Sequence, residues 1–336
     1  MGLVKPMLLG ARRFAAGIDV AARGVTLAVL SRRLFGAAPL RVEWLASAPL
    51  PREAMAGVEI VDRAAVVESL RGVFGGLPRE CAGAAMRCAM ALPASATLVA
   101  TVPLARLAPA SRITACSVDD SQIYAELEPL VLAEAERVAG VERQELAVDW
   151  RVAPPHSASP RQIEGGTQVT IAATARVHLE ARVECAAMAG IMLCAVDDEA
   201  HAALRAMRHA ASFELPSHEP YVALWIGTEG IRGWILSDDT IAREIRFPAL
   251  EYADLVEALR DLVHGEQPGC TFVAGDIGML RGVHFTLADI GDALGCPVMP
   301  FECAALADPD RPLPLVLSHD PSCAVAFGLA LRGLSE

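Results

Sequence analysis

The sequence lacks the usual features of metal-binding, nucleic-acid-binding and membrane-spanning proteins. It contains no C-x-x-C pair and no histidine at metal-ligand spacing. No basic cluster interleaved with aromatic residues offsets the formal net charge of −12, which argues against nucleic-acid binding. The most apolar stretches are broken by proline or too short to span a bilayer, so we expect no direct membrane insertion.

The cysteines and the amino-terminal residues favour a cytoplasmic protein. Most of the nine cysteines lie in apolar runs, which favours buried, reduced thiols. The first residues, MGLVKPMLLGARRF, place a short apolar patch before most of the positive charge, which is unlike a signal peptide, and Pro6 stands where a myristoylation signal needs Ser or Thr. The chain of 336 residues, 53% hydrophobic and 21% charged, is long enough for two or three domains.

Two segments of the chain repeat one order of predicted elements. In residues 16–30, Asp19 ends an apolar run and a small-residue turn leads into a second run. Residues 221–247 have the same plan around the turn at residues 227–230. Each hairpin is followed by a third strand, a helix (62–74 or 250–263) and a closing strand (87–92 or 270–274). This pattern predicts an α/β, actin-like fold of two duplicated ribonuclease H-like βββαβα halves facing a cleft.

A segment of different character lies between the two units. We expect strands at 98–103, 146–152 and 168–177, a helix at 122–139, and a Pro/Ser/Gly-rich loop at 153–166. The acids Asp197, Asp198 and Glu199 allow a metal site, but they stand directly before a helix, so helix capping is the favoured interpretation.

Several motifs, in order, resemble those of a known family. Gly17-Ile18-Asp19 resembles an opening phosphate-1 strand, residues 189–207 the return to the first domain, residues 273–276 an adenosine turn, and residues 324–332 a closing helix. The chain therefore resembles the PilM family, actin-like assembly proteins of bacterial type IV pili, and more distantly FtsA. The resemblance implies subdomain 1A at 15–93, 191–215 and 316–333, an inserted subdomain 1C at 94–190, and a second half at 219–315 (2A, with 2B missing or minimal).

The resemblance implies a nucleotide site, from which this sequence departs. The vestigial positions are Asp19, Ala21, Ala22, Gly227, Thr228, Gly275 and Asp276. Ala21, Ala22 and Arg23 stand where the family has Gly-Ser-Ser, Trp225 stands where an Asp supports Mg²⁺, and Asp276 replaces a glycine. ATP with Mg²⁺, held through Asp19, is implied by the family, but three parts that would support hydrolysis are changed or missing. We therefore expect no catalytic residues and at most a weak ATPase.

Two hypotheses remain open, and a sugar or acetate kinase is disfavoured because no cleft base is found. In the first, the chain is a scaffold peripheral to the bacterial inner membrane, and a groove between the first domain and the inserted module holds the cytoplasmic tail of a PilN-like membrane protein. Candidate groove segments surround Leu98, Val99, Val102, Val169 and Ile171. In the second, ATP binding drives a switch. The resemblance also implies contacts with pilus ATPases and self-association.

Overall fold

The computed structural model describes residues 11–34, 39–82, 85–107, 120–153, 167–216, 218–228, 230–238, 240–247, 252–308 and 312–335. Cys116 and all but the first residue of the predicted loop at 153–166 lie outside these described residues. Contacts divide the chain into unit 1, which comprises the segments up to Pro93 and from Arg182 onward, and unit 2, Ala94–Ala181. The predicted insertion, 94–190, ends two residues after helix α7 (Arg176–Met188), whereas the boundary between the two units falls within α7. The subdomain assignment stays a prediction.

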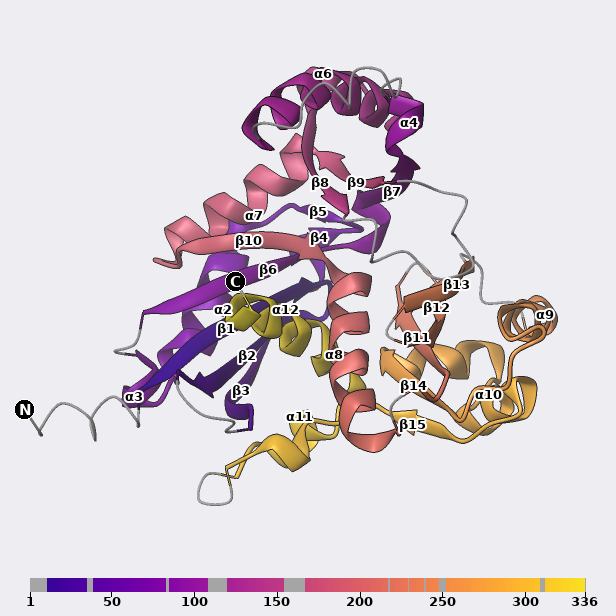
Figure 1. Cartoon of the computed structure of the whole chain (residues 1–336). Helices are drawn as coiled ribbons and strands as arrows, with labels where there is room; N and C mark the ends of the chain where they lie inside the picture. The colour runs from indigo at the N-terminus through magenta and orange to yellow at the C-terminus, as the bar shows by residue number, and fades with distance from the viewer. Residues whose placement is uncertain are drawn as a thin grey trace, which may run out of the picture. The chain divides into compact units, whose positions relative to one another are not determined.

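The first sheet of unit 1 has five strands in the order β10-β6-β1-β2-β3 (Figure 1). β1 pairs antiparallel with β2 and parallel with β6, and β10 continues the sheet parallel to β6. The strands are β1 (Arg12–Ala21), β2 (Gly24–Arg33), β3 (Arg41–Pro49), β6 (Met86–Leu92) and β10 (Leu193–Asp198). The carboxyl ends of β1, β6 and β10 therefore meet at one edge of the sheet, which is where Asp19 and Asp198 lie.

The second sheet of unit 1 repeats this topology, in the order β13-β12-β11-β14-β15. Its first three strands form an antiparallel meander, and β14 and β15 add in parallel. The strands are β11 (Tyr221–Gly227), β12 (Gly230–Ser237), β13 (Thr240–Phe247), β14 (Cys270–Gly275) and β15 (Val298–Pro300). Two sheets of the same strand order confirm the predicted duplicated, actin-like fold.

Helices cover these sheets where the sequence places apolar stripes. In the second half, leucines 255, 259 and 262 of α9 (Tyr252–Leu262) join the core beneath the sheet together with α10 (Leu287–Leu294). In the first half, the helix predicted at 62–74 is α2 (Arg63–Gly75), and its N-cap, Asp62, accepts a hydrogen bond from the Ala65 amide. Shorter elements are β4 (Met55–Ala56), β5 (Glu59–Ile60), α3 (Arg79–Ala82), α4 (Leu104–Leu107) and α11 (Leu315–Ser318).

Helix α12 (Ala324–Ser335) is buried along almost its whole length, between the first sheet and α8 (Glu199–Glu214). Glycines permit this close approach: a Cβ on Gly328 would lie 1.8 Å from the Ala202 oxygen, and a Cβ on Gly17 would lie 1.8 Å from the Ala326 oxygen. The resulting packing holds β1, and with it Asp19, in a fixed place. No described helix is long and apolar enough to cross a membrane.

Unit 2 is a three-stranded antiparallel sheet, β7-β9-β8, covered by the long helix α6 (Asp120–Ala139). Its strands are β7 (Thr97–Pro103), β8 (Leu146–Ala153) and β9 (Gln168–Ala175). The buried faces of β7 and β9 pack on Leu127, Val131 and Ala135 of α6. Unit 2 therefore has a hydrophobic core of its own.

Candidate functional site

The turn of the first hairpin places a buried carboxylate at the end of β1. Asp19 lies opposite Thr26, and Ala21 and Gly24 close the hairpin, leaving Ala22 and Arg23 exposed at its tip. The Oδ1 atom of Asp19 is buried and has no hydrogen-bond partner among the described residues. Burial raises the pKa of Asp19 to about 6, although the positive charges of Arg182 and Arg23 act to lower it.

A fully buried arginine places a positive charge near this carboxylate and partly offsets the effect of its burial. The guanidinium of Arg182, in α7, donates hydrogen bonds to the Ala91 oxygen (3.0 Å) and the Val58 oxygen (3.2 Å). Burial lowers the pKa of Arg182, while the negative charges of Glu199 and Asp19 act to raise it. The first half thus supplies its own cation at the sheet edge where Asp19 lies.

The turn of the second hairpin is covered by an aromatic ring. Trp225, on β11, is 4% exposed. A Cβ built on Gly227 would lie only 2.0 Å from the Cη2 atom of Trp225, so the indole lies directly over this glycine. Thr228, at the turn, is exposed. The indole therefore occupies the space above Gly227, where an anion would have to approach the backbone.

The remaining predicted positions, Gly275 and Asp276, follow β14. Gly275 has a φ of +95°, and a Cβ there would lie 2.1 Å from the Ile226 oxygen, so glycine is required. Asp276 accepts a hydrogen bond from the Gly278 amide and forms an ion pair of 2.9 Å with Arg23. The ion pair between Arg23 and Asp276 therefore joins the tip of the first hairpin to the turn after β14. Both residues depart from the family pattern.

These residues do not fit a magnesium-bound nucleoside triphosphate. Such a ligand needs ionised carboxylate oxygens around the metal's water shell and open backbone N–H groups around the phosphates. The unpartnered Oδ1 of Asp19 offers one oxygen, but burial raises the pKa of Asp19 to about 6 and so makes the ionised form costlier than in an exposed carboxylate. The indole of Trp225 covers Gly227, and Asp276 adds a negative charge next to Arg23.

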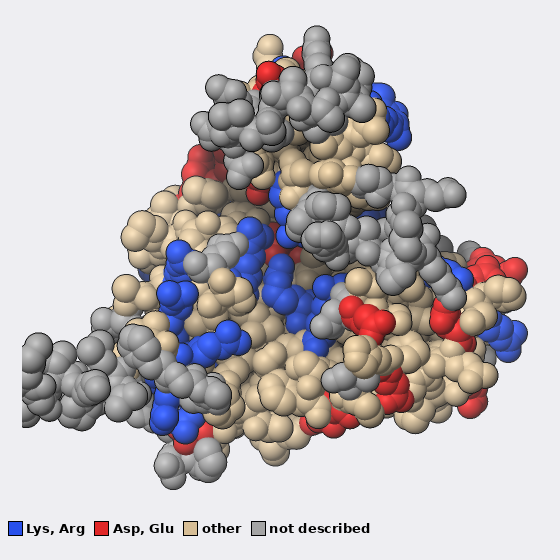
Figure 2. Space-filling model, viewed as in Figure 1, with Lys and Arg blue, Asp and Glu red and all other residues tan. Residues whose placement is uncertain are grey.

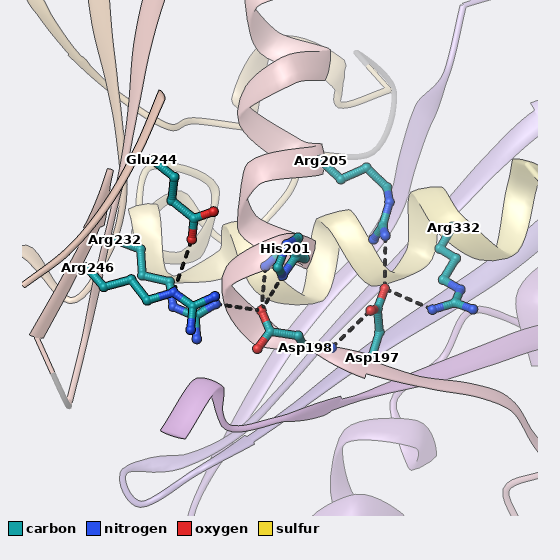
Figure 3. A network of polar contacts seen from close by, with 8 residues as sticks. All are labelled: Asp197, Asp198, His201, Arg205, Arg232, Glu244, Arg246 and Arg332. Carbon is teal, nitrogen blue, oxygen red and sulfur yellow. Dashed lines mark hydrogen bonds and ion pairs between the residues drawn. The ribbon is translucent and has the colours of Figure 1, made fainter. Parts of the chain in front are cut away.

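Asp197 and Asp198 belong to an ion-pair network (Figure 3). Asp198 caps α8 by accepting from the His201 amide at 2.8 Å, which confirms the predicted capping role. It also lies 3.5 Å from the Arg232 guanidinium of β12, which links the two halves of unit 1. Asp197 pairs with Arg205 and Arg332, at 2.9 Å and 3.0 Å.

The charge environment of Asp197 is consistent with a structural role. Burial alone would raise the pKa of Asp197, but the charges of Arg205 and Arg332 outweigh burial and lower it. The carboxylate thereby ties β10 to α8 and α12. Among the described residues, no group of three or more His, Cys, Asp or Glu side chains is arranged to hold a metal ion.

The candidate partner residues have different environments within unit 2. Val102, Val169 and Ile171 are at most 5% exposed and pack in the core beneath α6. Leu98 packs at the margin of the same core, whereas Val99 is half-buried on the opposite face of β7. Among these candidates, Val99 thus lies on the face of β7 that does not pack on α6.

A surface depression of about 620 Å³ contains none of the predicted site residues. It is lined by residues of α10 and the segment that follows it: Leu287, Ala288, Gly291, Asp292, Gly295, Cys296, Pro297 and Val298. Sequence analysis missed the buried cation Arg182, because the glutamates two residues before and after it, Glu180 and Glu184, make this part of α7 read as a solvated face. It also missed the pairing of Arg23 with Asp276, for which local sequence carries no signal.

The two sheets of matching strand order define an actin-like fold. A family model described as "Type IV pilus assembly protein PilM" matches residues 17–239, which is more than half of the chain. The chain belongs to this family. No match was found among curated protein sequences.

Solved structures show the same fold. The chain is similar to a structure described as the PilM-PilN type IV pilus biogenesis complex, with 20% identity and a TM-score of 0.67 over 95% of this chain and 98% of that one. A weaker similarity, with a TM-score of 0.45, is found to a protein of actin-like ATPase fold and unknown function from Bacteroides thetaiotaomicron, at 9% identity over 85% of this chain and 91% of that one. The same TM-score is found for the cytoplasmic domain of Vibrio cholerae EpsL, an inner membrane component of the type II secretion system, at 14% identity over 97% of this chain and 96% of that one.

Proposed function

We propose that this chain is a non-catalytic scaffold in type IV pilus assembly that binds the amino-terminal cytoplasmic peptide of a PilN-like inner-membrane protein. The observation that carries the proposal is membership of the PilM family over residues 17–239. The similar solved structure is a complex of PilM with PilN, which supports a partner of that kind. Binding to such a partner would hold the chain at the cytoplasmic side of the membrane.

The chemistry of the cleft supports a scaffold over a nucleotide-driven switch. Arg182 supplies the positive charge near Asp19 that a metal would otherwise bring, and Trp225 fills the space above Gly227. One observation favours the switch: the buried Oδ1 of Asp19 has no partner among the described residues. A switch requires ATP to bind one state better than the other, and the covered turn leaves few groups for that difference.

Within unit 2, strand β7 is the edge we propose for the peptide. It pairs with β9 on one side and reads TLVATVP, without a charged residue. The opposite edge strand, β8, carries Asp149 and Arg151, which discourage pairing with another chain. An extended peptide that adds to β7 would gain main-chain hydrogen bonds and would contact Val99 and Thr101 on the accessible face.

The test is a titration of the purified chain with the cytoplasmic peptide of the PilN-like protein encoded beside it. We expect saturable binding, at least tenfold weaker for Val99→Glu combined with Thr101→Glu. Arg151→Glu, on the other edge strand, is the matched control and should bind like the original chain. Absence of binding by the original chain contradicts the scaffold. If the variant with Val99→Glu and Thr101→Glu binds the peptide as tightly as the original chain, the scaffold role stands but β7 is not the binding edge.

The same proposal includes contacts with pilus ATPases and self-association. Both are testable with the purified chain, by co-sedimentation with the ATPase and by light scattering over a range of concentrations. Neither is needed for the peptide-binding role.

A further inference from the structure

We propose that the ends of β1 and β2 form a docking surface for the anionic headgroups of a lipid membrane. The surface, called here the arginine face, consists of Arg13, Arg32 and Arg87. Arg13 lies directly opposite Arg32 in the hairpin, and Arg87 lies on β6 opposite Ala15, two residues further along β1. Because side chains two residues apart share a face of a sheet, all three lie on the same face.

The three arginines are exposed and uncompensated. None of them forms a hydrogen bond or an ion pair within the described part of the chain. Two like charges directly opposite each other destabilise a pair of strands. By contrast Arg12, on the other face of β1, is paired with Glu43 and Ser31. The charge of the arginine face is thus left available for an external anion.

Large apolar side chains border the arginine face. Leu34 is 47% exposed, and its amide donates to the Ala11 oxygen, which extends the hairpin beyond Arg32 on the same face. Burial, and to a lesser extent the charge of Arg32, lower the pKa of His209. The ring of His209 lies 5.0 Å, centroid to centroid, from the ring of Phe213, which is 63% exposed. Exposed cations beside exposed Leu and Phe are typical of a surface that rests on lipid.

The distribution of charge over unit 1 supports contact between the arginine face and an anionic membrane. The whole chain has a formal net charge of −12, so a local cluster of cations is needed for any attraction to an anionic surface. On the face seen in Figure 2, Lys and Arg gather over the first sheet, whereas Asp and Glu lie mostly over the second half of unit 1.

A lipid surface suits these residues better than an acidic protein segment does. An acidic segment would satisfy the arginines and leave Leu34 and Phe213 in water. An anionic bilayer offers phosphate groups and an apolar layer beneath them at the same time. This inference extends the scaffold role, because it gives the chain a membrane contact that does not pass through its protein partner.

The experiment is co-sedimentation of the purified full chain with vesicles, half phosphatidylglycerol and half phosphatidylcholine, or phosphatidylcholine alone. Binding is expected only to the anionic vesicles, and it should weaken as salt is added. Arg13→Gln with Arg32→Gln should weaken partitioning about thirtyfold, since each cation near such a surface contributes roughly 1 kcal/mol. The matched control, Arg260→Gln with Arg281→Gln, removes two exposed arginines of the second half and should bind like the original chain.

Three outcomes would overturn the proposal. The original chain could fail to bind anionic vesicles at low salt, the Arg13/Arg32 variant could bind as tightly as the original, or the control variant could lose as much binding. Binding of a polyglutamate peptide that depends on Arg13 and Arg32, without vesicle binding, would assign the face to an acidic protein segment instead. The Arg13/Arg32 variant removes a like-charge pair, so its unfolding midpoint is expected to be unchanged or slightly higher.

Discussion

The two halves of unit 1 share a strand order but differ at their first hairpin turns. In the first half, the turn follows a buried carboxylate, Asp19, whose burial is only partly offset by the charge of Arg182. In the second half, the corresponding strand carries Trp225, whose indole lies over Gly227. The two halves share a strand order because packing of their apolar cores requires it. The residues at the hairpin turns contribute little to those cores, so they can differ between the halves. The strand order of the two halves is therefore shared, while the chemistry of their first turns is not.

The largest expected effect on stability comes from removing the indole of Trp225, which lies over the turn of the second hairpin. Trp225→Ala should lower the free energy of unfolding by about 4 kcal/mol, because a large buried ring is replaced by a cavity. The measurement is urea unfolding followed by circular dichroism. Trp44→Ala, which removes a half-buried indole from the third strand of the first half, is the control and should cost less. A loss below about 1 kcal/mol for Trp225→Ala would contradict a packed ring.

The next effect concerns the compensating cation of the first half. Arg182→Met should cost about 3 kcal/mol at pH 7.5, because it leaves the Ala91 and Val58 oxygens without a donor and the carboxylate of Asp19 without its cation. The loss should be smaller at pH 5, where Asp19 binds a proton.

Arg63→Met is the matched control for this variant, since it removes an exposed ion pair with Glu184 and should change little. Both variants are compared by urea unfolding at the two pH values. An equal loss at pH 5 and pH 7.5 would show that Arg182 does not compensate Asp19.

The protonation of Asp19 gives a pH dependence of defined sign. Burial raises its pKa to about 6, so the folded chain holds this proton more tightly than the unfolded chain does. The stabilisation is complete below about pH 4, the ordinary range of an aspartate, and is lost as the pH rises through 6. Asp19→Asn should remove this slope and raise the thermal midpoint at pH 7.5.

Asp292→Asn, at an exposed position of α10, is the control, and its curve of midpoint against pH should run parallel to that of the original chain. A variant Asp19→Asn that is less stable at pH 7.5 would mean that the ionised carboxylate is favourable, as it is in a metal-binding hairpin.

The smallest effect is expected for the ion pair between the halves. Arg23 is 65% exposed, so a double-mutant cycle of Arg23→Ala and Asp276→Ala should give a coupling below about 1 kcal/mol that shrinks in high salt. Urea unfolding of the four variants measures it. A cycle of Arg23 with Asp289, which instead bonds to Thr286, should give no coupling. A large, salt-insensitive coupling would mean that this pair holds the halves together.

Local features of the fold were predictable, and long-range contacts were not. The hairpins, the cap at Asp62 and the cap at Asp198 depend on neighbours a few residues apart, so the sequence pattern was sufficient. The pairing of Arg23 with Asp276 joins segments far apart in the chain, and no periodicity reports it.

The partner groove illustrates a second limit. Val169 and Ile171 alternate along β9 as expected for a strand with one apolar face, but the pattern cannot tell a face that awaits a ligand from one already covered by a helix. In the structure α6 covers it. The burial of the cysteines was easier to predict, because it follows from their apolar neighbours in the sequence. Of the cysteines described, all but Cys194 are buried, and all are free thiols.

The most direct test of the account is a calorimetric titration of the PilN-like cytoplasmic peptide into the chain, with and without millimolar Mg-ATP. A scaffold with an eroded cleft should bind the peptide with the same affinity in both conditions, and Mg-ATP alone should neither raise the unfolding midpoint nor be hydrolysed. Peptide binding that requires Mg-ATP, or steady turnover of ATP by the chain, would contradict the account.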